Sequence, residues 1–219
     1  YQVAAANKGI VVGTGNKVED FGVGFYTKYG DGGVDISPIA DCTKTEIWEL
    51  GKELKIPQER VAILIGKKGQ TKRLLERKTK TKLLISPEGS VLISSEENIH
   101  CFDALPIINA VGRGFNPEVA LMLLDEKFSF ELIQIKDFAK NDHDLIRLRS
   151  RTIGTNGKAR MMLEKLTGVF VSVYGKTVAL IGKVEDNELA RRAVEKLLKG
   201  APHGNVYKYI ELQKREALM

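Results

Sequence analysis

Two Gly-x-x-Gly tetrapeptides, GKKG at 66–69 and GTNG at 154–157, are the residues of this chain whose spacing best suits a chemical task. A glycine has no Cβ, so it allows a sharp turn between two helices and lets another molecular backbone pass close to its own. A helix that starts directly after such a turn presents free N–H groups and the positive end of its dipole to phosphate. The spacing therefore predicts two turns that suit the close approach of another backbone and of phosphate groups.

The two loops differ in charge. The first contains two lysines, whereas the middle residues of the second are uncharged and its basic residues follow in the next helix. A single motif of this kind is more often only a glycine-capped turn, so the prediction depends on its repetition in one context. Three upstream arginines, Arg147, Arg149 and Arg151, could compensate for the neutral loop or could form a solvated helix face. The residues in and beside the loops that are predicted to contact such a ligand are Gly66, Lys67, Lys68, Gly69, Lys72, Gly154, Thr155, Asn156, Gly157, Lys158 and Arg160.

The tetrapeptides belong to an internal repeat. Residues 65–93 and 153–181 align at a constant offset of 88 without a gap, and eight of the 29 aligned positions are identical. Self-similarity of this kind indicates two copies of one supersecondary unit. Ile65, Leu75, Ile153 and Leu163, the aliphatic residues around the loops, are expected in the core rather than against bases. Met161 and Met162 are expected to be core or tail residues, and with Leu74 and Leu166 they continue the helical spacing of apolar residues.

Each copy is predicted to contain the same elements in the same order. A short strand precedes a helix, the glycine loop, a second helix, two strands joined by a tight turn, and a closing helix. Alternating valines at 169, 171 and 173 are typical of a half-buried strand. The expected ranges of the initial strand, first helix and closing helix are 54–56, 59–65 and 103–112 in the first copy, and 130–135, 144–153 and 187–199 in the second.

This order of elements resembles the KH domain, of the type whose closing helix lies at the C-terminus. The resemblance implies that each loop clamps about four nucleotides of single-stranded RNA, with single-stranded DNA or a purely structural KH pair as alternatives. The stretches IPQERVAILIGKKGQTK, AVGRGFNPEVALMLL, SVYGKTVALIG and GAPHGNVYKYIE look like the archaeal tandem-KH ribosome-assembly proteins. The eukaryotic relative of that family is called Partner of Nob.

The family resemblance runs from about Lys55 to the C-terminus. It implies an α+β fold with two tandem type I KH domains, each a three-stranded sheet packed on helices, at 55–125 with a helical extension and at 126–219 with a C-terminal helix. It also implies binding near the 3′ end of small-subunit ribosomal RNA during ribosome assembly, and association with the alpha subunit of translation initiation factor two. No cofactor is expected for this region, and we expect residues 58–219 to fold and bind RNA alone.

The N-terminal residues resemble a different family. The stretch VVGTGNKVEDFGVGFYTKYGDGGVDISPIADCTKTEIWELGKEL is similar to part of the ammonia- or glutamine-dependent NAD synthetases, which implies an incomplete α/β segment at 1–54. Adenylation of a carboxylate by such an enzyme needs a metal ion and cations beside the transferring phosphates. By that resemblance ATP would contact Thr14 and Lys44, deamido-NAD would contact Lys28 and Asp35, and Glu19 would hold magnesium.

An NAD synthetase fused to a KH pair is therefore the alternative function. The chain has no SGGxDS pyrophosphate loop, so we predict that the segment is inactive and that no catalytic residue can be assigned. ATP and magnesium would be cofactors only if missing sequence completes it. Because the chain begins with Tyr1, in a stretch typical of the end of a helix closing at Gly9, we expect sequence upstream.

The amino-acid composition indicates which classes of protein this chain can belong to. The 219 residues are 43% hydrophobic and 28% charged, which suits a globular protein with a sizeable core. Residues 1–57 carry six Lys and eight acidic residues, whereas 58–219 carry 28 Lys and Arg and 20 acidic residues. This basic excess favours a polyanionic partner. No apolar run reaches the roughly 20 residues of a membrane span, and two distant cysteines and three scattered histidines predict neither disulfides nor a metal site. A cytoplasmic protein with no membrane partner is expected.

Overall fold

The computed structural model describes residues 53–95 and 97–216. Leu54–Met219 forms one compact unit, which holds almost all of the described residues. Within the described part of the chain, no helix is both long and apolar enough to cross a membrane. The expected helix end at Gly9 and the residues expected to bind ATP, deamido-NAD and magnesium lie outside the described residues: Thr14, Glu19, Lys28, Asp35 and Lys44.

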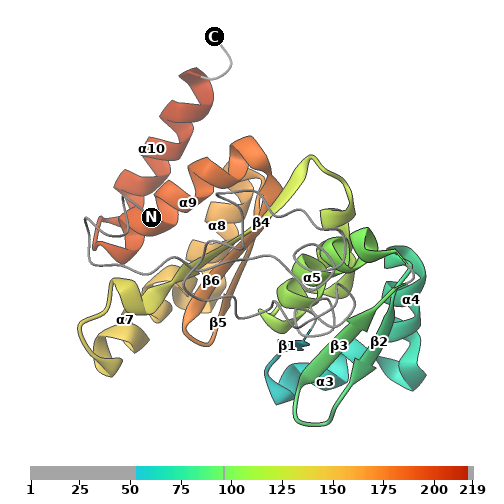
Figure 1. The fold of residues 1–219 in the computed structure, drawn as a ribbon. Coiled ribbons are helices and arrows are strands. Elements are labelled where there is room, and N and C mark those ends of the chain that lie inside the picture. The colour runs from blue at the N-terminus through green and yellow to red at the C-terminus, as the bar shows by residue number, and fades with distance from the viewer. Residues whose placement is uncertain (1–52, 96, 217–219) are drawn as a thin grey trace, which may run out of the picture. The chain divides into compact units, whose positions relative to one another are not determined.

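The first half of the described chain is a three-stranded sheet covered by helices, with strand order β1-β3-β2 (Figure 1). Strands β2 and β3 are antiparallel, and the pairing of Leu83 with Ile93 sets their register. The elements are β1 (Glu53–Lys55), α3 (Gln58–Ile65), the 3₁₀ turn η3 (Lys67–Gly69), α4 (Gln70–Thr79), β2 (Lys82–Ile85), β3 (Ser90–Ser94) and α5 (Asn98–Gly112).

The second half repeats this order and adds a helix. Its sheet has the order β4-β6-β5, with both strand pairs antiparallel. The connection between the halves consists of α6 (Pro117–Ala120) and η4 (Leu121–Leu124). The repeated elements are β4 (Phe128–Gln134), η5 (Ile135–Asp137), α7 (Asp142–Ile153), η6 (Thr155–Gly157), α8 (Lys158–Thr167), β5 (Phe170–Tyr174), β6 (Thr177–Lys183) and α9 (Val184–Leu198), followed by α10 (His203–Glu216).

The α+β prediction is confirmed, and every element expected in the two copies is present. The largest difference in bounds is at α5, which starts five residues before the expected position 103. Cys101 and Ala104 are both buried in the core of the first half. The apolar face of α5 therefore extends towards the N-terminus beyond the stretch that shows a regular helical pattern.

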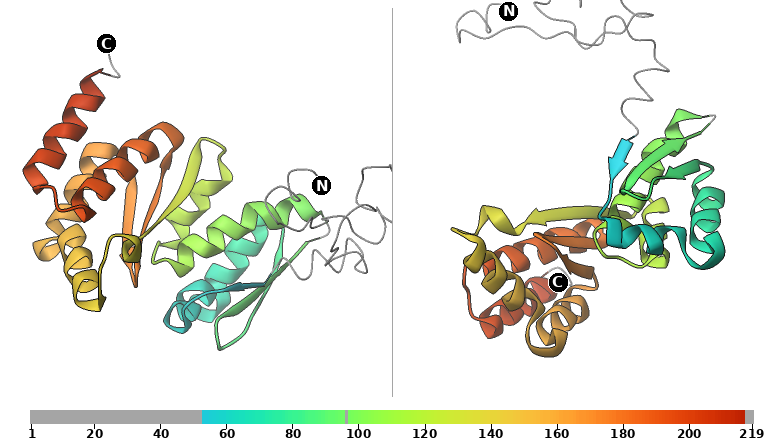
Figure 2. Two further views of the ribbon diagram at one scale, coloured as in Figure 1. Left: turned by 60° about the vertical axis from the view of Figure 1, so that its left-hand side comes forward. Right: turned by 90° about the horizontal axis from the view of Figure 1, so that it is seen from below.

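The central strand of the second sheet is buried on both faces. Every residue of β6 from Thr177 to Gly182 is buried, and its alternate residues pack in different cores. Val178 and Leu180 face the helices of their own half, whereas Ala179 and Ile181 join the core that contains α5. Figure 2 shows α7–α10 on one side of this sheet and α5 on its other side. The two halves therefore form one packed body.

The gapless alignment of the two copies is wrong beyond the hairpin turn. Leu83 and Val171 are equivalent, but Leu83 pairs with Ile93 whereas Val171 pairs with Leu180. The second hairpin is thus one residue shorter than the first. Since side chains alternate between the faces of a strand, a shift of one residue places the aligned Leu92 and Leu180 on opposite faces. Leu92 is exposed and Leu180 is fully buried.

Candidate nucleic-acid interface

The two glycine loops have the same backbone conformation. The third residue of each has positive φ, with φ 52° and ψ 28° at Lys68 and φ 53° and ψ 29° at Asn156. The fourth residue is also left-handed, with φ 76° at Gly69 and φ 74° at Gly157. Each loop forms one 3₁₀ turn that leads directly into the next helix. The structure therefore places the two tetrapeptides in matching positions, as the repeat predicts.

The first glycine of each loop is needed for internal packing. A Cβ on Gly66 would lie 2.1 Å from Oγ1 and 2.9 Å from the amide nitrogen of Thr71. A Cβ on Gly154 would lie 2.8 Å from the amide nitrogen of Ala159. Both glycines also end the preceding helix, since their N–H groups donate to the carbonyls of Ala62 and Ser150. These two positions shape the turn and do not by themselves provide access for a ligand.

The fourth glycine of each loop faces open space. A Cβ on Gly157 would meet no atom within 4 Å, and a Cβ on Gly69 would meet only the guanidinium of Arg73 at 3.9 Å. Both residues still need glycine because their φ is positive. Gly69 and Gly157 are thus the positions where another backbone can approach closely, followed by the N-termini of α4 and α8.

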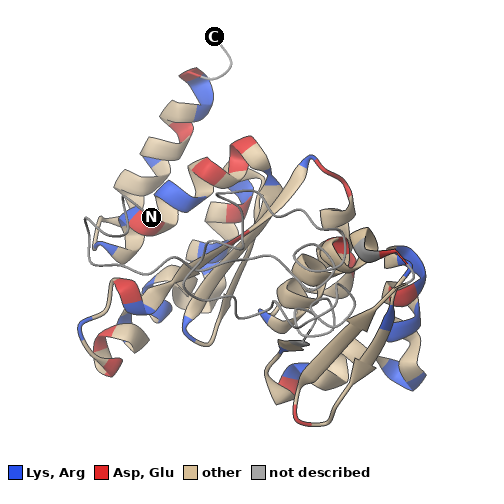
Figure 3. Ribbon diagram, in the orientation of Figure 1, with Lys and Arg blue, Asp and Glu red and all other residues tan. Residues whose placement is uncertain are grey.

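The cations near the loops are used in different ways. Lys67 and Lys68 are exposed in the first loop, while Thr155 and Asn156 are exposed in the second. Arg73 contacts the first loop, since its guanidinium donates to the carbonyl of Lys68 at 3.2 Å. Figure 3 shows basic residues gathered along α4, which carries Lys72, Arg73, Arg77 and Lys78.

Two of the predicted contact residues take part in ion pairs within their own helices. Lys72 lies 3.8 Å from the carboxylate of Glu76. Arg160 lies 3.4 Å from that of Glu164 and also donates to the carbonyl of Val171 at 3.3 Å. Lys158 is exposed at the start of α8. Among these three residues, Lys158 is the one whose charge is most available to a ligand.

The glutamates of these pairs position the edge strands, a role that sequence reasoning missed. The N–H of Leu83 donates to Oε1 of Glu76, and the N–H of Val171 donates to Oε1 of Glu164, both at 2.9 Å. Each glutamate thereby ties a helix to the neighbouring strand. Glu76 and Glu164 occupy equivalent, identical positions of the repeat, and this identity is the sequence feature that could have indicated their shared role.

Of the upstream arginines, Arg151 has a structural role. It donates to the carbonyl oxygens of Leu197 and Gly200, at 3.1 and 3.2 Å, and to that of Ala201, so it caps the end of α9. Arg147 binds the carboxylate of Asp144 at 2.6 Å. This hydrogen bond and one from the backbone of Lys140 lower the pKa of Asp144. Arg147 and Arg151 are therefore engaged within the protein, which weakens the idea that they compensate for the neutral loop.

The expectation that Met161 and Met162 belong to the core is wrong. Met161 is 48% exposed and Met162 is 39% exposed, whereas Leu163 is buried. Their equivalents in the first copy are Arg73 and Leu74, because the offset of 88 holds on this side of the hairpin. Two apolar side chains thus stand at the surface one helical turn after the second loop.

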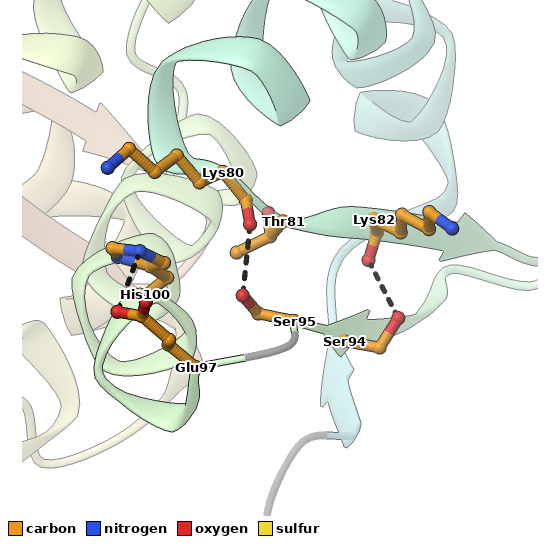
Figure 4. Close-up of a pocket in the computed structure, with 7 residues that line it drawn as sticks. All are labelled: Lys80, Thr81, Lys82, Ser94, Ser95, Glu97 and His100. Carbon is orange, nitrogen blue, oxygen red and sulfur yellow. Dashed lines mark hydrogen bonds and ion pairs between the residues drawn. The ribbon is translucent and has the colours of Figure 1, made fainter.

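A pocket of about 620 Å³ lies away from the loops, where β2 begins and β3 ends (Figure 4). The hydroxyl of Ser95 donates to the carbonyl of Lys80 at 3.0 Å, and His100 lies 3.5 Å from the carboxylate of Glu97. These polar groups have partners within the pocket wall. Over the described residues, no cluster of three or more His, Cys, Asp or Glu side chains could hold a metal ion.

Comparisons with known proteins separate the two parts of the chain. The family model for the eukaryotic type KH domain (KH domain type I) matches residues 129–215. A KH domain-containing protein of Methanocaldococcus jannaschii is 44% identical over 167 residues, which are 74% of this chain and 74% of that protein. The chain belongs to this family of archaeal KH domain proteins.

Solved structures of KH-family proteins have the same fold. Dim2p from Pyrococcus horikoshii is 46% identical, and the match covers 73% of this chain and 97% of that one with a TM-score of 0.68. In the complex of a/eIF2alpha, aDim2p and rRNA from the same organism, the matching chain is 45% identical. The match covers 75% of this chain and 94% of that chain, with a TM-score of 0.70.

The N-terminal segment matches the second family. The model for NAD synthase matches residues 1–84. The NH(3)-dependent NAD(+) synthetase of Methanosarcina acetivorans is 62% identical over 48 residues, which are 22% of this chain. The match spans only 18% of that enzyme. The synthetase resemblance is thus strong over a short stretch.

Proposed function

We propose that this chain binds single-stranded RNA through two tandem type I KH domains and acts in assembly of the small ribosomal subunit. The observation that carries the proposal is the matching geometry of the two glycine loops, each with an open fourth glycine at the start of a helix. Such a position suits a phosphate backbone, because it combines close approach with the positive end of a helix dipole.

The proposed RNA is the 3′ region of small-subunit ribosomal RNA. The similarity to aDim2p, whose structure is described as a complex with a/eIF2alpha and rRNA, supports this choice and the alpha subunit of initiation factor two as a protein partner. The excess of Lys and Arg over acidic residues in 58–219 gives the electrostatic attraction that such an RNA needs. We place this activity in the cytoplasm, where ribosomal RNA and the factor would meet.

The test is fluorescence anisotropy with the full chain and labelled oligonucleotides. Single-stranded RNA from the 3′ end of small-subunit rRNA should bind more tightly than the same sequence as a duplex or as DNA. Gly69→Asp and Gly157→Asp each place bulk and negative charge at an open position, so both should weaken binding. Equal affinity of the wild type and both variants would contradict the proposal. Preference for single-stranded DNA would assign the chain to DNA instead.

Partner binding needs a separate measurement. Calorimetry with the purified alpha subunit, with and without RNA, should show a saturable complex. Failure to bind this subunit would remove the protein partner and leave the RNA proposal intact.

NAD synthesis is the alternative function, because 48 residues of the N-terminal segment are 62% identical to a synthetase. Adenylation needs the triphosphate to be held in line with the acceptor carboxylate, and the chain has no SGGxDS loop for this. We therefore expect no NAD from deamido-NAD, ATP, magnesium and ammonia. Turnover by the purified chain that is lost in Glu19→Ala would establish the enzyme function instead.

A further inference from the structure

The first sheet, with strand order β1-β3-β2, exposes two leucines on its outer face. Leu84 and Leu92 lie opposite each other in the β2–β3 pair, and they are 63% and 37% exposed. The alternate residues Leu83, Val91 and Ile93 point to the inner face and are buried in the core with α5. Single exposed apolar residues are common on proteins, but these two side chains form one cross-strand pair.

The equivalent face of the second sheet is covered by a helix. With the offset of 88, Leu84 corresponds to Ser172. The strand pairing then makes Ala179 the equivalent of Leu92. Ala179 is fully buried in the core that contains α5. The hydroxyl of Ser172 donates to the carbonyl of Arg113 at 2.8 Å, directly after the last residue of that helix. The second copy therefore shows that this face of the repeated sheet can receive a helix.

The covered face and the exposed face differ in the size of their side chains. Serine and alanine allow a close approach, since a Cβ on Gly114 would lie only 2.6 Å from the hydroxyl oxygen of Ser172. The first sheet has a leucine at both positions, so it offers a larger apolar area. Because α5 already packs in its own half and on the second sheet, the segment that covers the first sheet must be a different one.

The charge beside the two leucines is positive. Lys82 lies two residues before Leu84 and therefore on the same face of β2. Lys55 is exposed, whereas its neighbours Leu54 and Ile56 pack in the core, so it points to the outer face. Among the side chains of β1, β2 and β3 that the structure describes, none is acidic. Lysine stems can also cover apolar surface while their ammonium groups stay in water.

The pocket in Figure 4 continues this surface where β2 begins and β3 ends. Lys82 and Ser94 are paired across the two strands and line the pocket. Lys80 adds another cation, while the carboxylate of Glu97 lies 3.5 Å from His100 in the pocket wall. The outer face thus combines an apolar pair with an excess of positive charge.

We infer that the outer face of the first sheet binds an amphipathic helix of a protein partner, one that carries carboxylates beside its apolar residues. An amphipathic helix presents its apolar side chains as a stripe, which suits the pair formed by Leu84 and Leu92. Carboxylates beside that stripe complement Lys55 and Lys82, and such complementarity selects partners and speeds their encounter. The inference goes beyond the proposed function and does not rest on it, because neither glycine loop belongs to this face.

Two helical peptides of about 18 residues test this inference with the full chain. Both have leucines at positions i, i+3, i+4 and i+7, with glutamates beside the leucines in one peptide and lysines there in the other. In methyl NMR titrations the acidic peptide should shift the signals of Leu84 and Leu92 until saturation. It should bind about 10-fold more tightly than the basic peptide. Unchanged leucine signals, or equal affinity of the two peptides, would overturn the inference.

Two variants of the face separate its apolar and charged parts. Leu84→Ser with Leu92→Ala gives the first sheet the residues of the second, and it should weaken binding of the acidic peptide about 10-fold or more. Lys55→Glu with Lys82→Glu should reverse the preference between the peptides. Leu212 is 56% exposed on α10, so Leu212→Ser is the matched control and should leave the affinity unchanged. Circular dichroism establishes that each variant is folded.

The outcomes also distinguish the inference from the proposed function. Single-stranded RNA should not displace the acidic peptide, and displacement would assign the face to the nucleic-acid interface and overturn the inference. Sedimentation velocity tests whether a second copy occupies the face. A dimer of the wild type that dissociates in the Leu84→Ser and Leu92→Ala variant would likewise overturn it. A chain that binds the acidic peptide but no RNA would contradict the proposed function and leave the inference standing.

Discussion

The guanidinium carbon of Arg60 lies 6.0 Å from the centre of the Tyr174 ring, a cation–π distance that joins the first half of the protein to the second. The same guanidinium donates to the carbonyls of Val111 and Phe115, at 2.9 and 2.8 Å, at the end of α5. Tyr174 donates through its hydroxyl to the carboxylate of Glu59. One arginine thus binds the carbonyls at the end of α5 in its own half and contacts a ring of the other half.

Alkaline pH should loosen this contact. Burial, followed by the hydrogen bond to Glu59, raises the pKa of Tyr174. The folded state therefore holds the phenolic proton more tightly than the unfolded state, so the contribution of this group is complete below the ordinary tyrosine pKa of about 10 and disappears as pH rises through the raised value. Urea unfolding at pH 8 and at pH 10.5 should show a smaller alkaline loss of stability in Tyr174→Phe than in the wild type.

Another tyrosine provides the comparison for this experiment. Burial also raises the pKa of Tyr207, which packs in the core of the second half. Tyr207→Phe should therefore remove a separate part of the alkaline loss, and the two effects should add because the sites share no partner. An alkaline loss that is the same in Tyr174→Phe and in the wild type would show that this phenol does not titrate with folding.

The two glycines of the second loop should differ in how much their substitution lowers the free energy of unfolding. Gly154→Ala brings a methyl group within 2.8 Å of the amide nitrogen of Ala159 and adds left-handed strain, so we expect a loss of about 3 kcal/mol or more. Gly157→Ala meets no neighbouring atom and should cost only about 1–2 kcal/mol from its positive φ. Urea unfolding measures both. Equal losses would mean that Gly154 is as open as Gly157.

The glutamates that tie helix to strand should matter more than surface charges. Glu164→Ala leaves the N–H of Val171 without its carboxylate acceptor, which should lower the free energy of unfolding by about 1–3 kcal/mol. Glu164→Gln keeps an acceptor and should cost less. Glu188 pairs with Arg192 on an exposed face, so Glu188→Ala should change stability by less than about 1 kcal/mol. Similar losses for Glu164→Ala and Glu188→Ala would contradict a positioning role for Glu164.

Local patterns predict the elements well because each copy is short and repeats. The identical Leu75 and Leu163 are buried, and the identical Thr79 and Thr167 each donate to the carbonyl four residues earlier. These roles depend only on contacts within one copy, so the same residue types occur at equivalent positions of both copies.

Features that depend on contacts between residues far apart in the sequence, or on how the helices sit in the fold, were not predictable. Ile181 aligns with Ile93, yet one packs against the other half and one in its own core, because the second hairpin is a residue shorter. Met161 has the spacing of a core residue, but it stands at the surface with 48% of its side chain exposed. Arg151 could not be distinguished from a surface cation, since its acceptors lie about 50 residues away.

The RNA-binding unit should begin at β1, at Glu53. The sequence predicts that residues 58–219 fold alone, but such a fragment would lack β1, which begins at Glu53. It would also lack Ile56, which is 3% exposed and whose N–H donates to the carbonyl of Gly89 at 2.9 Å. The side chain of Ile56 fills the space beside Gly112, where a Cβ would lie 2.7 Å from Ile56 Cγ2. Removing that side chain alone should cost about 2–5 kcal/mol.

A fragment of residues 53–219 should therefore unfold cooperatively and bind single-stranded RNA as the full chain does, whereas 58–219 should melt at a lower temperature. The variant Ile56→Ala within 53–219 separates the effect of the buried side chain from that of the strand, because it keeps the backbone pairing of β1 with β3. Its melting temperature should fall between those of the two fragments. Identical melting of 53–219 and 58–219 would show that neither β1 nor Ile56 contributes to stability, and the boundary would then move to Gln58.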